Sequence, residues 1–105
     1  MIATAGGNLV VLALYREKWQ EAEMLAREAL SLAETIGRQH AIAANHHHLA
    51  YALLQLGKAT EALPHSTQAV ALYRRAAAPE LVSASKLLRE CQAAVKPAYP
   101  GRTLV

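Results

Sequence analysis

The stretch HLAYALLQLGKATEALPHSTQAVAL, residues 48–72, carries the clearest structural pattern of the chain. Leu and Ala are its commonest residues, and both are strong helix formers. A single glycine, Gly57, divides it into two pieces of helical length. Gly is also the residue that most often follows the last turn of a helix, because it adopts the left-handed conformation without strain. The stretch therefore predicts two helices joined by a short turn.

The same pattern occurs once more, 40 residues earlier in the chain. WQEAEMLAREALSL (residues 19–32) aligns with ATEALPHSTQAVAL (59–72), and NLVVLAL (8–14) aligns with HLAYALL (48–54). Self-similarity at a fixed period of roughly 20–50 residues is typical of helical arrays. The chain therefore contains two copies of one helix–turn–helix unit.

The fold class expected for the whole chain is all-α. Its 105 residues allow one domain. Phe is absent, and Ala and Leu dominate the apolar residues, whereas strands favour β-branched and aromatic residues. Apolar residues recur at steps of three and four, as in amphipathic helices. The expected helices span about residues 8–17, 18–36, 38–56, 58–77 and 79–96.

These helices group into two repeats with flanking segments. Repeat 1 covers residues 8–37 and repeat 2 covers residues 38–78. Residues 79–96 are expected to form a capping helix or the first helix of a third repeat. Residues 1–7 are expected to be a lead-in, and residues 97–105 a disordered tail.

The two units resemble the tetratricopeptide repeat, in the long variety seen in kinesin-light-chain-like proteins and bacterial regulators. In that family a Leu and a small residue mark the first helix, a Gly closes it, and Ala residues mark the second. The residues that match, which we expect to define the packing of the repeat, are Leu9, Ala22, Ala29, Leu49, Ala50, Gly57, Ala62 and Ala69. The chain departs from the family pattern at Val10 (small residue), Glu17 (turn Gly) and His46 (usual Trp).

The resemblance implies antiparallel helix pairs stacked as a short right-handed α-solenoid whose concave face is the usual peptide-binding groove. The residues expected on that face are Val11, Leu14, Tyr15, His47, Tyr51, Leu54 and Gln55. We therefore expect a non-catalytic scaffold that binds a protein or peptide on this face or at the open ends of the array. It could be a small protein or a fragment of a larger regulator.

Two alternatives stay open. Arrays usually need at least three repeats for stability, so a chain with two repeats could instead be a self-associating homo-oligomer.

The consecutive His46, His47 and His48 suggest a His-dependent metal or pH responder. However, successive helical residues turn by about 100°, so the three imidazoles point in different directions and cannot bind one ion. Chelation along one helix needs His at i and i+4, and no such pair includes these residues. We expect no metal site and no cofactor.

Catalysis is not expected either. Ser66, Ser83, Ser85 and Cys91 are possible nucleophiles. None of them follows a Gly-rich loop, and the chain contains no Asp to orient a His.

Charge and cysteine usage indicate which class of partner and which cellular compartment to expect. The net charge of +3 is not concentrated in a basic cluster, since only Arg74 and Arg75 are adjacent, so nucleic-acid binding is not expected. The single Cys91 fits a reducing cytoplasm. The apolar run NLVVLALY, residues 8–15, is too short to span a bilayer. The chain is therefore expected to be cytoplasmic, with a protein as its partner.

Overall fold

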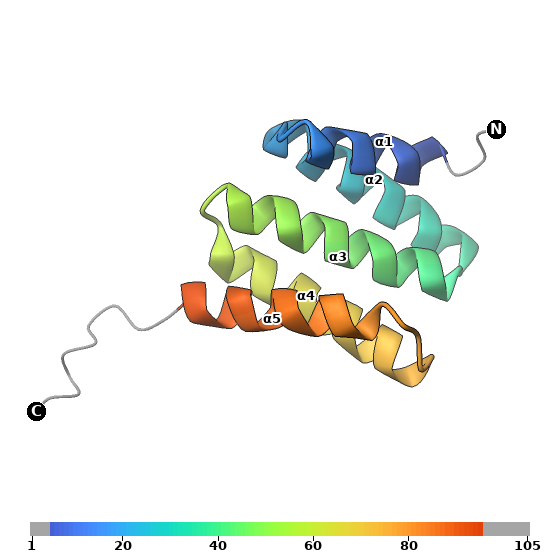
Figure 1. Ribbon diagram of the computed structural model, residues 1–105. Helices are drawn as coiled ribbons and strands as arrows, with labels where there is room; N and C mark the ends of the chain where they lie inside the picture. Colours follow the sequence, from blue (N-terminus) through green and yellow to red (C-terminus); the bar gives the residue numbers. More distant parts are fainter. Residues whose placement is uncertain (1–4, 96–105) are drawn as a thin grey trace, which may run out of the picture.

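The computed structural model describes the backbone of residues 5–95 and the side chains of residues 9–95. Five α-helices and no strand occur in this range. They are α1 (Ala5–Tyr15), α2 (Trp19–Ile36), α3 (Gln39–Gln55), α4 (Ala59–Arg75) and α5 (Leu81–Ala94). Each helix packs against the next, and α3 also contacts α1 and α5. As Figure 1 shows, α1, α3 and α5 lie side by side in one layer, and α2 and α4 form the layer behind it. The prediction of an all-α helical-repeat solenoid is confirmed.

Every helix boundary lies within three residues of the expected one, and two of the differences have a clear local cause. α1 begins at Ala5, so it includes Gly6 and Gly7, because a Gly costs a helix only about 0.5–1 kcal/mol and does not forbid it. Pro79 precedes α5 instead of starting it, since the amide of Leu81 bonds to the carbonyl of Ala78 and closes a separate turn. Residues 1–4 of the expected lead-in and the whole expected tail, residues 97–105, lie outside the described residues.

The main core lies between the two layers. Leu49 and Leu53 of α3 are fully buried together with Val10 of α1. Leu87 and Cys91 of α5 belong to the same cluster of buried side chains. α5 therefore contributes to a core that all five described helices share.

Small side chains let the helices come close to one another. Ala22, Ala50, Ala62 and Ala69 are fully buried, and side chains of this size allow an interaxial distance at the short end of the roughly 8–10 Å range. Ala29 is only partly buried. Leu9, expected to pack like its counterpart Leu49, is instead 50% exposed. α1 is the first described helix, and no described helix lies on its outer side. Leu9 therefore does not share the burial of Leu49 in the described structure, and its role in the packing of the repeat stays a prediction.

The four turns between helices are copies of one structure. At each turn a residue has positive φ, namely Glu17 (57°), Gly37 (83°), Gly57 (79°) and Ala77 (54°). The next residue donates its amide to the carbonyl five residues before it, in the pairs Lys18–Ala13, Arg38–Ala33, Lys58–Leu53 and Ala78–Tyr73. This is the Schellman motif, which satisfies carbonyls at a helix C-terminus. Glu17 therefore adopts the turn conformation despite not being Gly.

Replacing Glu17 with Gly is expected to stabilise the fold by about 0.5–1 kcal/mol. The left-handed conformation costs an L-residue roughly 1–2 kcal/mol, and the greater freedom of Gly in the unfolded chain offsets part of that gain. Urea unfolding followed by circular dichroism measures the difference. The matched control is Glu28→Gly, in the middle of α2, where the same substitution should destabilise by about 1 kcal/mol. Two changes of the same sign would contradict the prediction.

Candidate functional site

An open hollow lies where the end of α1 faces α3. Val11, Leu14 and Tyr15 of α1 and Tyr51 of α3 line it, and its volume is about 220 Å³. The three α1 residues share one face because they are spaced three and four apart. Tyr15 is 84% exposed, so its ring is available for contact. The structure thus brings together four of the seven residues expected on the concave face.

Trp19 extends this surface, although the sequence did not single it out as a site residue. Its ring makes an edge-to-face contact with that of Tyr51, with centroids 5.8 Å apart. Trp19 also lines a second open hollow of about 410 Å³, together with Lys18, Gln20, Glu21 and Leu56. The sequence feature that could have indicated Trp19 as a site residue is its position, since it is the only Trp of the chain and follows a turn directly. We call the surface formed by Val11, Leu14, Tyr15, Trp19 and Tyr51 the aromatic groove.

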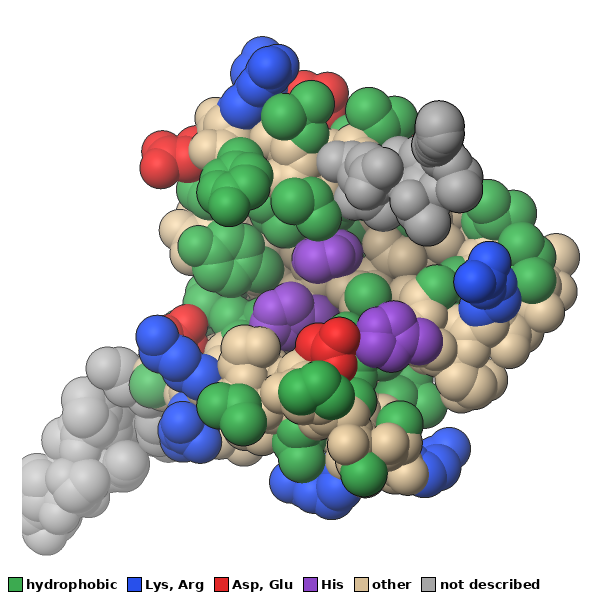
Figure 2. Space-filling view, turned by 45° about the vertical axis from the view of Figure 1, so that its right-hand side comes forward, with side chains coloured by type: hydrophobic (Ala, Val, Ile, Leu, Met, Phe, Trp, Pro, Cys, Tyr) green, Lys and Arg blue, Asp and Glu red, His purple; other side chains and the backbone are tan. Residues whose placement is uncertain are grey.

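The other three expected residues, His47, Leu54 and Gln55, lie on α3 but do not line the hollow of the aromatic groove. Leu54 is partly buried and packs against the main core, whereas Gln55 is exposed. His47 is partly buried and has an Nδ1 without a hydrogen-bond partner. Figure 2 shows histidine side chains in the middle of one face, bordered by hydrophobic side chains, with Lys and Arg at its margins.

Burial perturbs two consecutive histidines of α3. It lowers the pKa of His47. Burial, together with the charge of His47, lowers the pKa of His48 from its ordinary 6.5 to about 4. Both imidazoles are therefore neutral at pH 7.

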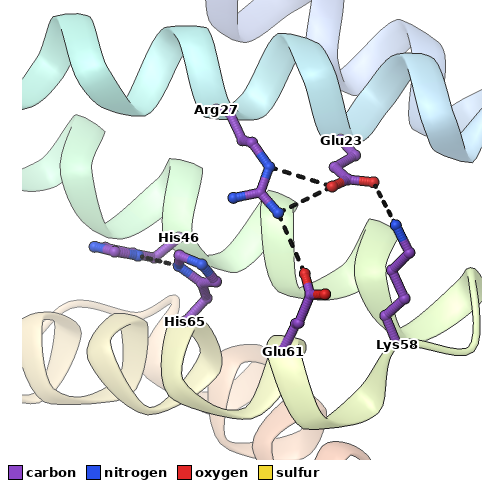
Figure 3. Close-up of polar contacts among 6 residues, drawn as sticks. All are labelled: Glu23, Arg27, His46, Lys58, Glu61 and His65. Atoms are coloured by element: carbon purple, nitrogen blue, oxygen red, sulfur yellow. Dashed lines mark hydrogen bonds and ion pairs between the residues drawn. The ribbon is translucent and has the colours of Figure 1, made fainter.

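A network of charges joins the two repeats through α2 and α4 (Figure 3). Arg27 bonds to Glu23 at 2.9 Å and to Glu61 at 3.4 Å, and Lys58 lies 3.6 Å from the second oxygen of Glu23. The hydrogen bond from Arg27 is the main reason why the pKa of Glu23 is lowered. Exposed ion pairs of this kind contribute little stability. The main effect of the network is therefore electrostatic, through the action of its charges on nearby side chains.

One of these neighbours is a pair of histidines. His46 of α3 and His65 of α4 face each other with their Nδ1 atoms 3.0 Å apart and their ring centroids 5.2 Å apart. Reasoning about one helix at a time missed His65. The pairing of the two helices of one repeat was the signal that could have found it.

Candidate metal ligands, the single cysteine and the apolar helices can each be examined in the described part of the chain. Among residues 9–95, no three His, Cys, Asp or Glu side chains are placed to hold a metal ion together. Cys91 is buried, and burial raises the pKa of its thiol, which disfavours the nucleophilic thiolate. None of the five described helices combines the length and apolar character needed to cross a bilayer.

Comparison with known proteins gives one match. No curated protein and no solved structure matches the chain significantly. A family model described as "Tetratricopeptide repeat" matches residues 1–75. The match covers more than half of the chain and agrees with the 40-residue period and the stacked helix pairs. The chain therefore belongs to the tetratricopeptide repeat family, whose members generally mediate protein–protein interactions and are typically non-catalytic.

Proposed function

We propose that this chain is a non-catalytic interaction module that binds a segment of a partner protein in the aromatic groove. The observation that carries the proposal is the exposure of Tyr15 beside Val11 and Tyr51 in an open hollow, with the ring of Trp19 against that of Tyr51. Grouped exposed apolar side chains are typical of interaction sites. Tyr and Trp are also the residues that most often dominate binding energy.

The chemistry of the groove indicates the kind of segment that it suits. The residues that line the first hollow carry no charge, and charged residues enter only beside Trp19, where Lys18 and Glu21 have opposite signs. The groove therefore suits an apolar or aromatic side chain of the partner. Tyrosine hydroxyls are available for hydrogen bonds to the partner's backbone.

The test begins with peptides selected from a displayed random library against the unaltered protein. Replacing Tyr15 with Ala is expected to weaken binding of the selected peptides at least tenfold, because truncating an aromatic hot-spot residue costs about 2 kcal/mol or more. Tyr15 is 84% exposed, so the fold should be unaffected. Val82→Ala is the control, since Val82 is 78% exposed but lies on α5, and it should leave the affinity unchanged.

The molar mass in solution separates this function from self-association. Among the described residues, α1 and α2 carry nearly all of the large exposed apolar side chains, and a second copy could also cover them. Light scattering across a dilution series is therefore recorded for both variants. Equal peptide affinity for the unaltered protein and Tyr15→Ala would contradict peptide binding in the groove. A dimer that Tyr15→Ala converts to a monomer would assign the groove to self-association.

A further inference from the structure

His46 of α3 and His65 of α4 are joined by a hydrogen bond between two imidazole rings. Each neutral imidazole has one nitrogen that donates and one that accepts a hydrogen bond. Because the two Nδ1 atoms lie 3.0 Å apart, one of them carries a proton and donates, and the other is unprotonated and accepts. Figure 3 shows the two rings pointing toward one another from α3 and α4. The neutral pair therefore contains two different tautomers, with the proton on Nδ1 in one ring and on Nε2 in the other.

The pair can take up one additional proton without losing this hydrogen bond. That proton binds to Nε2 of the donating ring, which becomes an imidazolium and still donates from its Nδ1. A hydrogen bond from a charged donor is shorter and stronger than one between neutral groups. The first added proton therefore leaves the link between α3 and α4 in place.

A second additional proton breaks the contact. The only lone pair that remains is on Nδ1 of the accepting ring, and this lone pair is the acceptor of the hydrogen bond. Once it is protonated, two N–H groups face each other without an acceptor between them. The two rings, with centroids 5.2 Å apart, then both carry a positive charge, and like charges at such a distance oppose one another. The doubly charged pair therefore has to separate.

The charges that act on the pair come from α2 and α4. Burial is the largest cause that lowers the pKa of His46 and of His65. The charge of His65 lowers the pKa of His46 further, and Arg27 lowers that of His65, whereas Glu34 raises both and Glu61 raises that of His65. Within the described part of the chain, α5 also packs against α3 and α4 but supplies none of these charges. Burial outweighs the two carboxylates, so both rings are neutral at pH 7 and become charged only in acid.

We propose that His46 and His65 form a pH-sensitive clasp between α3 and α4, which stays closed with at most one added proton and opens when both rings are charged. Histidine suits this role because its charge changes close to neutral pH. Opening of the clasp loosens the packing of α3 on α4, the two helices of the second repeat. Neither histidine lines the hollows of the aromatic groove, so the clasp does not depend on the proposed function.

Long-range ¹H–¹⁵N NMR of the histidine rings in the full chain tests the clasp. At about pH 8, one ring of the pair is expected to carry its proton on Nδ1 and the other on Nε2. On acidification the two rings should protonate in two steps at least about one pH unit apart, because strongly interacting groups titrate as a pair. In His65→Gln, His46 should titrate in one step, at a pH above the second step of the pair, since the neighbouring charge is gone.

The matched control for the titration is His40→Gln. His40 also lies on α3 but faces Glu80, so this variant should leave both steps of the pair unchanged. A double-mutant cycle then measures whether the contact joins the helices. Urea unfolding of His46→Ala, His65→Ala and the double variant isolates the coupling between these two side chains from the effects of other histidines. The coupling is expected to be stabilising at about pH 8 and to weaken as the pH falls into the second step.

Three results would each overturn the proposal. They are a proton on Nε2 in both rings at about pH 8, a titration of the pair in a single step, and a coupling between His46 and His65 that does not change with pH. Circular dichroism identifies any variant that fails to fold. The tautomers and the two steps are measured on the unaltered protein, so these two results decide even if a variant is lost.

Discussion

Replacing Leu49 with Ala is expected to lower the free energy of unfolding by about 3 kcal/mol. The side chain of Leu49 is fully buried and belongs to the cluster that contains Val10 of α1 and Leu87 of α5. Removing it loses transfer free energy and leaves a cavity, which together cost about 2–5 kcal/mol for a buried Leu. All five described helices contribute residues to this cluster, so the loss should affect all of them together. Urea unfolding followed by circular dichroism measures the change.

The matched control for this prediction is Leu32→Ala. Leu32 lies on α2 and is 61% exposed, so its truncation should change stability by less than about 0.5 kcal/mol. A small domain has only about 5–15 kcal/mol of stability, and Leu49→Ala should therefore shift the unfolding midpoint strongly. Similar midpoints for the two variants would mean that Leu49 does not occupy the core as described.

Acidification from pH 7 to pH 4 is expected to destabilise the fold, with His48 contributing about 2–3 kcal/mol. Folding lowers the pKa of His48 from its ordinary 6.5 to about 4. The unfolded chain therefore binds protons more readily below pH 6.5. The stabilisation is fully present above the unfolded pKa and is lost as the pH falls toward the folded pKa. Burial lowers the pKa of His46, His47 and His65 in the same direction.

Urea unfolding at a series of pH values tests this prediction. His48→Gln removes the titrating group and should reduce the loss of stability between pH 6.5 and 4.5. His40→Gln, an exposed histidine on the same helix, should leave that loss unchanged. The lowered pKa of Glu23 affects stability only below pH 4.5, which is the ordinary pKa of its carboxyl group. The pH range in which Glu23 acts is therefore separate from the range of pH 6.5 to 4.5 in which His48 acts. A stability that is flat from pH 7 to 4.5, or equal slopes for the two variants, would refute the assignment to His48.

The sequence alone was enough to predict the helices, the repeat and the family. Helix propensity, apolar spacing and turn residues act over a few positions, so Gly37 and Gly57 mark their turns without knowledge of the fold. The burial of Ala50 and Ala62 could also be predicted from the sequence, because both occupy positions that match the repeat pattern. Four of the seven residues expected on the concave face, among them Tyr15 and Tyr51, line one hollow.

Tertiary structure decided the features that depend on which helices face each other. The exposure of Leu9 differs from the burial of Leu49 because nothing described lies outside α1. Trp19 joins the aromatic groove only because α2 begins beside Tyr51. His46 meets His65 across 19 positions of sequence, a contact that the spacing along one helix cannot reveal. Periodicity fixes which face of a helix is apolar, whereas the side chain opposite each residue is set by how the helices pack in space.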